Sequence, residues 1–316
     1  MKARGIPASA LDIVSASLAD STYGQYDSCL RHWWQFCIEK HSDPFSADVP
    51  FILEFLACLV EKGASFNSTG CHRSAISLLL GPELAKDSRM IRFFRGLARI
   101  RPPAPRYDFT WDPNVLLQYF GALPPNSELP LSVLSKKSLA LLALISAHRM
   151  QTFSLIHRQD IRQLTDRIEI RIPSRIKTSG PRRTQPLLVL PFYLSDVNIC
   201  AASTLLHYLD RTKVLRQDIS RCFISFKKPF LPVSSQSLSR WMKDIMEEAG
   251  IDTSIFRAHS SRHAATSKAH RSGIDVDLIR RTAGWSSGSS VFAHFYKLDV
   301  VPDRADFARA LYDSVP

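Results

Sequence analysis

The densest group of polar residues in the chain lies near the C-terminus and reads Ala258-His-Ser-Ser-Arg-His-Ala-Ala-Thr266. Its His259 and Arg262 are three positions apart, so a helix presents both side chains on one face. The pair Gly284-Trp285 follows, and then the segment Phe292-Ala-His-Phe-Tyr296. A His-x-x-Arg pair alone is typical of many solvated helix faces. The succession of all three motifs indicates a specialised site instead.

Upstream of this segment, one arginine lies within an expected pair of apolar helices, and one lysine lies in an expected hairpin turn. Arg149 lies in Ser146-Ala-His-Arg-Met-Gln-Thr-Phe153. The segment Arg167-Ile-Glu-Ile-Arg-Ile172 alternates apolar and other residues with period two, which predicts a strand. Residues 185–190 form its expected hairpin partner, and Lys177 falls in the turn between the two strands. An ordinary solvated turn lysine would look the same.

The first hundred residues predict a compact unit of four helices. Apolar spacing together with capping and stop residues places these helices at Ser21–Cys37, Phe51–Lys62, Ser68–Leu80 and Ser88–Ile100. The segment Arg101-Pro-Pro-Ala-Pro-Arg106 that follows cannot be helix or central strand, so we expect it to be a linker. The expected domains are therefore residues 1–100 and 107–316, joined by residues 101–106.

The second expected domain is mainly helical, with one small β-hairpin. An apolar helix pair is expected over residues 135–156, before the hairpin. Further helices are expected after the hairpin, at residues 199–215, 237–249, 259–272 and 276–282. The sequence contains no internal repeat.

The composition favours a nucleic-acid partner without proving one. Lys and Arg number 41 against 29 Asp and Glu, a net charge of +12 in 316 residues. Such a surplus favours a polyanion, although an unrelated basic protein would also carry it. The six cysteines form no Cys-x-x-Cys pair, so free thiols are expected. No apolar run approaches the ~18 residues of a membrane span, which predicts a soluble protein of the cytosol or nucleus.

These motifs, in this order, resemble those of the tyrosine recombinases, the family of phage integrases and related proteins of eukaryotic mobile elements. That family carries a His-x-x-Arg helix, a Gly-His or Gly-Trp step and a nucleophilic tyrosine, with an arginine and a hairpin lysine upstream. The resemblance covers nearly the whole chain. It implies a mainly α fold, with an N-terminal helical core-binding (SAM-like) domain and a mixed α/β catalytic domain. The sequences around Arg149 and Gly284 are most similar to recombinases of DIRS-like retrotransposons and cryptons, which implies the nucleus.

The chain departs from the family pattern at two places. Most relatives carry an acidic residue three positions after the first arginine, where this chain has Thr152. Support for Arg149 must then come from elsewhere. The spacing from Trp285 to Tyr296 is also slightly longer than in most relatives. Among the eight tyrosines, Tyr296 remains the expected nucleophile, because Tyr312 falls in an expected terminal helix where packing explains it.

The residue types suit the cleavage of a phosphodiester. Arg149 and Arg262 would offer paired donors to the non-bridging oxygens. His259 would donate a further hydrogen bond, and Trp285 would serve either as a donor or as a packing wall. The resemblance implies a 3′-phosphotyrosine on Tyr296, with Lys177 as the general acid for the leaving oxygen. We expect no metal, cofactor or ATP, since the energy of the broken ester is kept in the covalent link.

Further residues are candidates for contacts to double-stranded DNA, although such side chains are more often simply exposed. They are His72, Arg73, Arg99, Arg101, Arg182, Arg183, Gln236 and Arg240. We expect the two domains to form a C-shaped clamp on the duplex. A dimer would occupy one site and a tetramer the synapse. The tail after Val300 would dock on a neighbouring subunit, or else pack on its own domain.

Three other functions compete with this interpretation. A domesticated relative would bind DNA without cutting it, although the intact set of pocket residues argues against that. A type IB topoisomerase would use the same chemistry to relax DNA, but the short chain and its tail favour recombination. An RNA-binding or scaffold protein has only the basic charge in its support.

Overall fold

The computed structural model describes residues 7–103, 106–177, 179–180, 185–285 and 299–300. The chain divides into two compact units, residues 1–105 and residues 106–316. Among the described residues, no helix combines the length and the apolar character that crossing a membrane requires.

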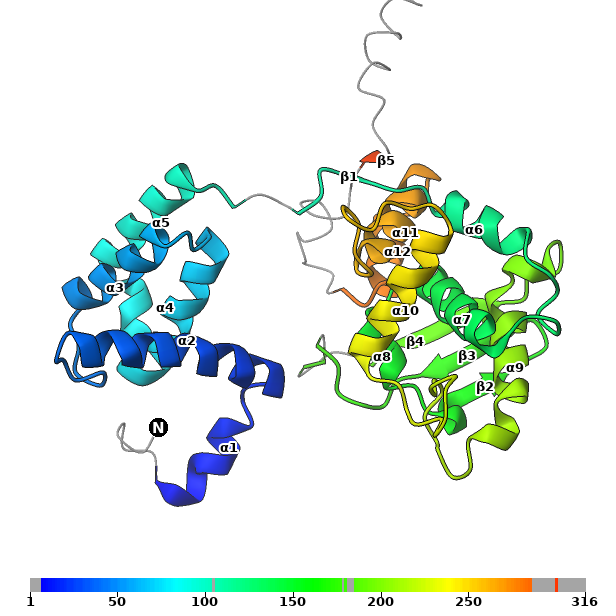
Figure 1. The fold of residues 1–316 in the computed structure, drawn as a ribbon, viewed down its shortest axis with the longest axis horizontal. Helices are drawn as coiled ribbons and strands as arrows, with labels where there is room; N and C mark the ends of the chain where they lie inside the picture. Colours follow the sequence, from blue (N-terminus) through cyan, green and yellow to red (C-terminus); the bar gives the residue numbers. More distant parts are fainter. Residues whose placement is uncertain (1–6, 104–105, 178, 181–184, 286–298, 301–316) are drawn as a thin grey trace, which may run out of the picture. The chain divides into compact units, whose positions relative to one another are not determined.

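The first unit is built from four long helices, preceded by the short α1 (Figure 1). The elements are η2 (Ala8–Ala10), α1 (Leu11–Ser15), α2 (Asp20–Glu39), α3 (Val49–Glu61), α4 (Phe66–Leu80), η3 (Pro82–Lys86) and α5 (Ser88–Ile100). Their apolar faces enclose a core that includes Trp33, Phe55, Ile76 and Met90, all at most 2% exposed. This packing stabilises short helices that would be marginal alone.

Capping explains where two of these helices begin. Asp48 accepts a hydrogen bond from the Phe51 amide, so α3 begins before the expected Phe51. The hydroxyl of Ser65 accepts from the Ser68 amide, so α4 begins at Phe66 and the expected start at Ser68 was wrong. The later Ser-Thr pair lies inside the helix instead.

The second unit surrounds a three-stranded antiparallel sheet with helices. The strands are β2 (Ile161–Gln163), β3 (Arg167–Arg171) and β4 (Leu187–Pro191), and the helices are α6 (Pro113–Gly121), α7 (Leu131–Ser146), α8 (Met150–Ser154), α9 (Ala201–Arg211), α10 (Ser235–Glu248), α11 (Ser260–Arg271) and α12 (Val276–Thr282). Short 3-10 turns are η4 (Arg158–Asp160), η5 (Val197–Ile199) and η6 (Lys213–Leu215). A two-residue parallel pairing joins β1 (Phe109–Thr110) to β5 (Asp299–Val300).

Helix α7 lies at the centre of the second unit and is buried on almost every side. It contacts β4, α9, α10 and α11, and Figure 1 shows it lying against the sheet. The sheet turns its alternate residues toward this core, and Ile168 faces Leu190 while Ile170 faces Leu188 in the register. The rigid helix therefore fixes its own C-terminal end, which leads to Arg149, relative to α10 and α11.

The sequence predicted the mainly helical architecture and the β3–β4 hairpin. The third strand, β2, was missed, because three residues are too few to show a periodicity. The expected helix over residues 199–215 is also shorter, since α9 ends at Arg211. There the buried Arg216 folds back, and its guanidinium binds the Thr212 hydroxyl. Helix α12 has the bounds that the sequence predicted.

Lys137 is a buried ammonium inside this core, and it predicts an unusual pH dependence of stability. The side chain on α7 is 0% exposed, and its Nζ has no hydrogen-bond partner among the described residues. Burial lowers the pKa of Lys137 to about 8, although Asp196 opposes the shift. The unfolded chain keeps this proton up to about pH 10.4. Unfolding therefore takes up a proton between these values, and stability rises with pH in that window.

We expect Lys137→Met to raise the free energy of unfolding at pH 7 and to flatten its rise between pH 8 and 10. Urea denaturation at pH 7 and pH 9.5 measures both effects. Lys136→Met is the matched control, because Lys136 pairs with Glu248 at 2.7 Å and its loss removes an ion pair. Equal stability of wild type and Lys137→Met at both pH values would contradict this role for the buried ammonium.

Candidate active site

A cavity of about 260 Å³ in the second unit brings several of the predicted residues together. Its lining comes from the N-terminal ends of α8, α10 and α11. The residues that line it are His148, Arg149, Met150, Gln151, Ser235, Gln236, Ser239, Ala258, His259, Ser261 and Arg262. Helix N-termini carry partial positive charge and unpaired amides, so three of them around one cavity favour an anion. We call this cavity the arginine pocket.

Arg149 reaches the arginine pocket because the chain turns sharply after α7. Ala147 has the left-handed φ of 50°, and Arg149 then stands in extended conformation as the N-cap of α8. The guanidinium is half-buried. Thr152 supplies no carboxylate, and in the part of the chain that the structure describes no ion pair is formed by Arg149. Its charge is therefore not neutralised by an internal carboxylate there.

Arg262 is held rigidly on α11. Its side chain is 1% exposed, and Nη1 donates a hydrogen bond of 2.6 Å to the carbonyl of Ala147. The guanidinium carbon lies 4.3 Å from the centre of the Trp285 ring, which is a cation–π contact. The same peptide turn that positions Arg149 thus also fixes Arg262.

His259 lines the arginine pocket and is the N-cap of α11. Burial of the ring, followed by the charges of His263, Arg262, Arg149 and Lys177, lowers its pKa well below the usual range. The residue keeps a solvent-exposed edge. It is therefore a neutral imidazole that a ligand in the pocket can reach.

Lys177 lies on the connection from β3 to β4, as the sequence predicted, and is exposed. It belongs to the electrostatic surroundings of the pocket, because its charge is among those that lower the pKa of His259. The predicted nucleophile Tyr296 lies outside the described residues, as do Arg182 and Arg183. Their positions remain predictions from the sequence.

Trp285 supports the pocket from behind Arg262. Besides its contact with the guanidinium, Trp285 packs against Ile279 of α12, which Val276 and Ala269 also contact. The sequence left two roles open for this residue, a hydrogen-bond donor and a packing wall. The observed contacts favour the wall, since the face of the ring covers Arg262.

The other candidate DNA contacts differ in their surroundings. Gln236 is exposed and lines the arginine pocket, and Arg240, one turn further along α10, is also exposed. Arg99 is exposed on α5 in the first unit. These three are accessible to a large ligand.

The remaining candidates in the first unit have structural partners. His72 is 6% exposed and packs edge-on against Phe55, so its ring has little surface to offer and we leave it out of the proposed contacts. Arg73 stacks on the ring of Phe94 at 4.4 Å. Arg101 donates a hydrogen bond of 2.8 Å to the Ala64 carbonyl, which ties the end of α5 to the loop after α3.

Sequence reasoning missed several residues of the arginine pocket. Ser235 and Ser239 enter it from α10, and Gln151 enters it from α8. They lie one or a few positions from Gln236 and Arg149, but no motif marks them. His148 lies in the Arg149 segment, yet no sequence pattern pointed to a role for it.

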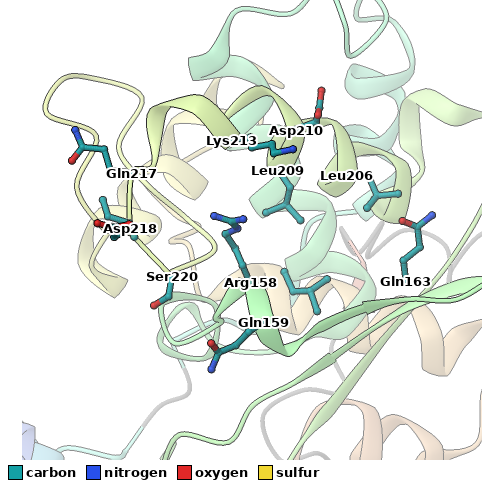
Figure 2. Close-up of a pocket in the computed structure, with 12 residues that line it drawn as sticks. Arg158, Gln159, Gln163, Leu206, Leu209, Asp210, Lys213, Gln217, Asp218 and Ser220 are labelled. Carbon is teal, nitrogen blue, oxygen red and sulfur yellow. The ribbon is translucent and has the colours of Figure 1, made fainter.

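A larger cavity lies elsewhere in the second unit, beside α9, β2 and the loop that follows η6 (Figure 2). It measures about 690 Å³ and carries Arg158 and Lys213 together with Asp210 and Asp218. Figure 2 shows leucine side chains of α9 in its wall. Because its charges cancel, the cavity has no net preference for an anion, unlike the arginine pocket.

Comparison with known proteins agrees with this geometry. Residues 126–300, more than half of the chain, match the model of the phage integrase family. No curated protein matches the chain. The matched residues include the sheet, the arginine pocket and α12.

Solved structures of recombinases share the fold. The XerH site-specific recombinase bound to its difH substrate has a TM-score of 0.59 and 14% identity, over 92% of this chain and 79% of that one. The Tn1549 transposon integrase in complex with transposon right-end DNA has a TM-score of 0.59 and 13% identity, over 94% of both chains. A lambda integrase dimer bound to a core site has a TM-score of 0.57 and 15% identity, over 92% of this chain and 93% of that one.

The fold and the family model together define the class of this protein, which is a tyrosine recombinase. The chain belongs to the phage integrase family.

The stacking of Trp285 on Arg262 predicts how substitutions at this position affect DNA cleavage. Trp285→Phe keeps an aromatic face over the guanidinium, so we expect its cleavage rate to stay within about threefold of wild type. Trp285→Ala removes the face and should cost about tenfold or more. The rate of covalent protein–DNA complex formation measures both. If Phe were as damaging as Ala, the indole N–H would be the important group and the wall role would be wrong.

Proposed function

We propose that this recombinase cuts and rejoins DNA at specific sites of a mobile element, through a 3′-phosphotyrosine on Tyr296. The observation that carries the proposal is the convergence of Arg149, His259 and Arg262 on one pocket. Trp285 covers Arg262 and precedes Tyr296 in the same segment. This convergence supports an anionic ligand that is held firmly by two guanidiniums, which is what a scissile phosphate needs.

The two arginines would bind the non-bridging oxygens of the phosphate. More negative charge gathers on these oxygens in the transition state, and fixed guanidiniums stabilise it without reorganising. Arg262 is fixed by the Ala147 carbonyl and Trp285. The backbone of Arg149 is positioned at the start of α8, and its side chain lines the same pocket. The amide ends of α10 and α11 add to the positive potential.

The remaining groups would handle protons. His259, with its lowered pKa, is neutral at pH 7 and donates a hydrogen bond to the same phosphate. The phenolate of Tyr296 attacks phosphorus, and the bond to the 5′ oxygen breaks. Lys177 gives that oxygen its proton. In the reverse direction, a 5′ hydroxyl of a new strand attacks the phosphotyrosine and releases the tyrosine, so rejoining needs no ATP.

We extend the proposal to the assembly and its context. The partner is double-stranded DNA, with Gln236, Arg240 and Arg99 among the contacting side chains. A dimer on each site and a tetramer in the synapse would follow, with the tail after Val300 docking on a neighbouring subunit. The sequence around Arg149 and Gly284 supports an element of the DIRS-like or crypton kind and a nuclear location.

Covalent capture tests the proposed reaction. Wild type is used first to select duplexes from a random pool, and a bound duplex is then nicked so that cleavage cannot reverse. Without metal or ATP, we expect a protease-sensitive covalent band on a denaturing gel. Tyr296→Phe should abolish the band, whereas Tyr312→Phe should leave it.

The outcomes separate the competing functions. Binding without any covalent species, across the whole selected pool, would contradict the proposal and favour a silent DNA-binding protein. A covalent species that relaxes supercoiled DNA but never joins two different duplexes would favour a topoisomerase. A band that survives in Tyr296→Phe would show that another residue is the nucleophile.

A further inference from the structure

His148 lies near both arginines of the pocket, and the proposed reaction gives it no role. It directly precedes Arg149, it lines the arginine pocket, and it is only 4% exposed. Its ring approaches Gly284 with Cε1 nearest, so that an added methyl group would be 3.0 Å from Cε1 and about 3.7 Å from each ring nitrogen. Only glycine permits so close an approach without displacing the ring.

The ring also binds the end of α12. The ring lies near the backbone of Thr282, and this backbone contact raises the pKa of the ring, opposing the effect of burial. Residues 282 and 284 flank the turn at which α12 ends, and Gly284 has the left-handed φ of 68°. One imidazole thus holds both sides of that turn.

These contacts form a closed chain of neighbouring residues that passes through the arginine pocket. Trp285 follows Gly284 and covers Arg262, and Arg262 donates to the carbonyl of Ala147, the residue before His148. The turn after α12 and the turn after α7 are therefore connected twice. One connection is the contact of His148 with Gly284, and the other runs from Trp285 through Arg262 to Ala147. Without the His148 side chain, only the connection through Arg262 would remain.

We propose that His148 is a positioning residue, which anchors the Gly284–Trp285 turn to the helix end that carries Arg149. By holding this turn, it keeps Trp285 over Arg262 and fixes the start of the segment that leads to Tyr296. The inference rests on the proposed function, because the arginine pocket is taken as the site of cleavage. His148 acts through its neighbours and touches no reacting atom.

The charge state of the ring suits this role. Burial, and then the neighbouring Arg262 and Arg149, lower the pKa of His148 to about 4. The ring is therefore neutral at pH 7 and adds no repulsion to the two guanidiniums. An aliphatic side chain would also be neutral, but it has no polar group for the Thr282 backbone.

The first test compares cleavage with DNA binding in variants of His148. We expect His148→Leu to lower the single-turnover cleavage rate about tenfold, through loss of the ring's contacts with Gly284 and Thr282, while the Kd for DNA stays within about twofold. His148→Asn and His148→Gln each place a donor near one ring nitrogen, and one of them should restore most of the rate. A rate that is unchanged in His148→Leu, or a loss that neither amide restores, would overturn the proposal.

The second test uses the glycine that the ring contacts. Gly284→Ala should slow cleavage because its methyl displaces the ring, and His148→Ala/Gly284→Ala should be no slower than Gly284→Ala alone. Gly273→Ala is the matched control, since Gly273 also has a left-handed φ, of 81°, but an added methyl meets nothing within 4 Å. Equal effects of the two glycine substitutions, or additive effects in the double variant, would contradict a specific contact.

A spectroscopic readout separates this inference from the proposed function. The indole N–H resonance of Trp285, assigned through Trp285→Phe, should shift in His148→Leu and return in the amide variant that restores the donor. This holds whether or not the protein cleaves DNA. If wild type forms no covalent complex, the proposed function alone is refuted. If the Trp285 resonance does not change in His148→Leu, the positioning role alone is refuted.

Discussion

The hydrogen bond from Arg262 to the carbonyl of Ala147 is the interaction on which the rest of the site depends. A guanidinium that is 1% exposed must have its donors satisfied and its charge balanced, or the fold would lose several kcal/mol. Here one donor meets a carbonyl that the left-handed turn at Ala147 presents, and Trp285 covers one face. A bound phosphate would supply the negative charge that this environment favours.

That single bond links elements far apart in the sequence. Helix α7 is surrounded by the sheet, α9, α10 and α11, so its C-terminal end can move little. Because Arg262 binds the turn that follows α7, helix α11 is held to the same point, and His259 at its N-cap is held with it. The N-terminus of α10 completes the enclosure. Preorganised donors of this kind accelerate a reaction because they need no rearrangement as charge develops.

The sequence predicted those parts of the molecule that depend on local pattern. The alternation in residues 167–172 predicted β3, and the spacing of His259 and Arg262 predicted a shared helix face and a shared pocket. The role of Trp285 as a cover for Arg262 was only one of two alternatives, because a sequence does not show which way a ring faces. His72 looked available on its helix, yet it is buried against Phe55, since helical spacing does not reveal which face a neighbouring helix covers. His148 could not be assigned, because its importance depends on Gly284, which lies more than a hundred residues away.

Arg262→Lys tests the claim that the arginine pocket holds the phosphate that is cleaved. Lysine keeps the charge but lacks the planar guanidinium, which donates to the Ala147 carbonyl and stacks on Trp285. Arg211→Lys is the matched control, because Arg211 also donates to a backbone carbonyl, that of Ser127, outside the pocket. With thermal unfolding checked for each variant, we predict that Arg262→Lys binds DNA within about threefold of wild type but cleaves it at least about a hundredfold more slowly. Cleavage by Arg262→Lys at the rate of Arg211→Lys would contradict the claim.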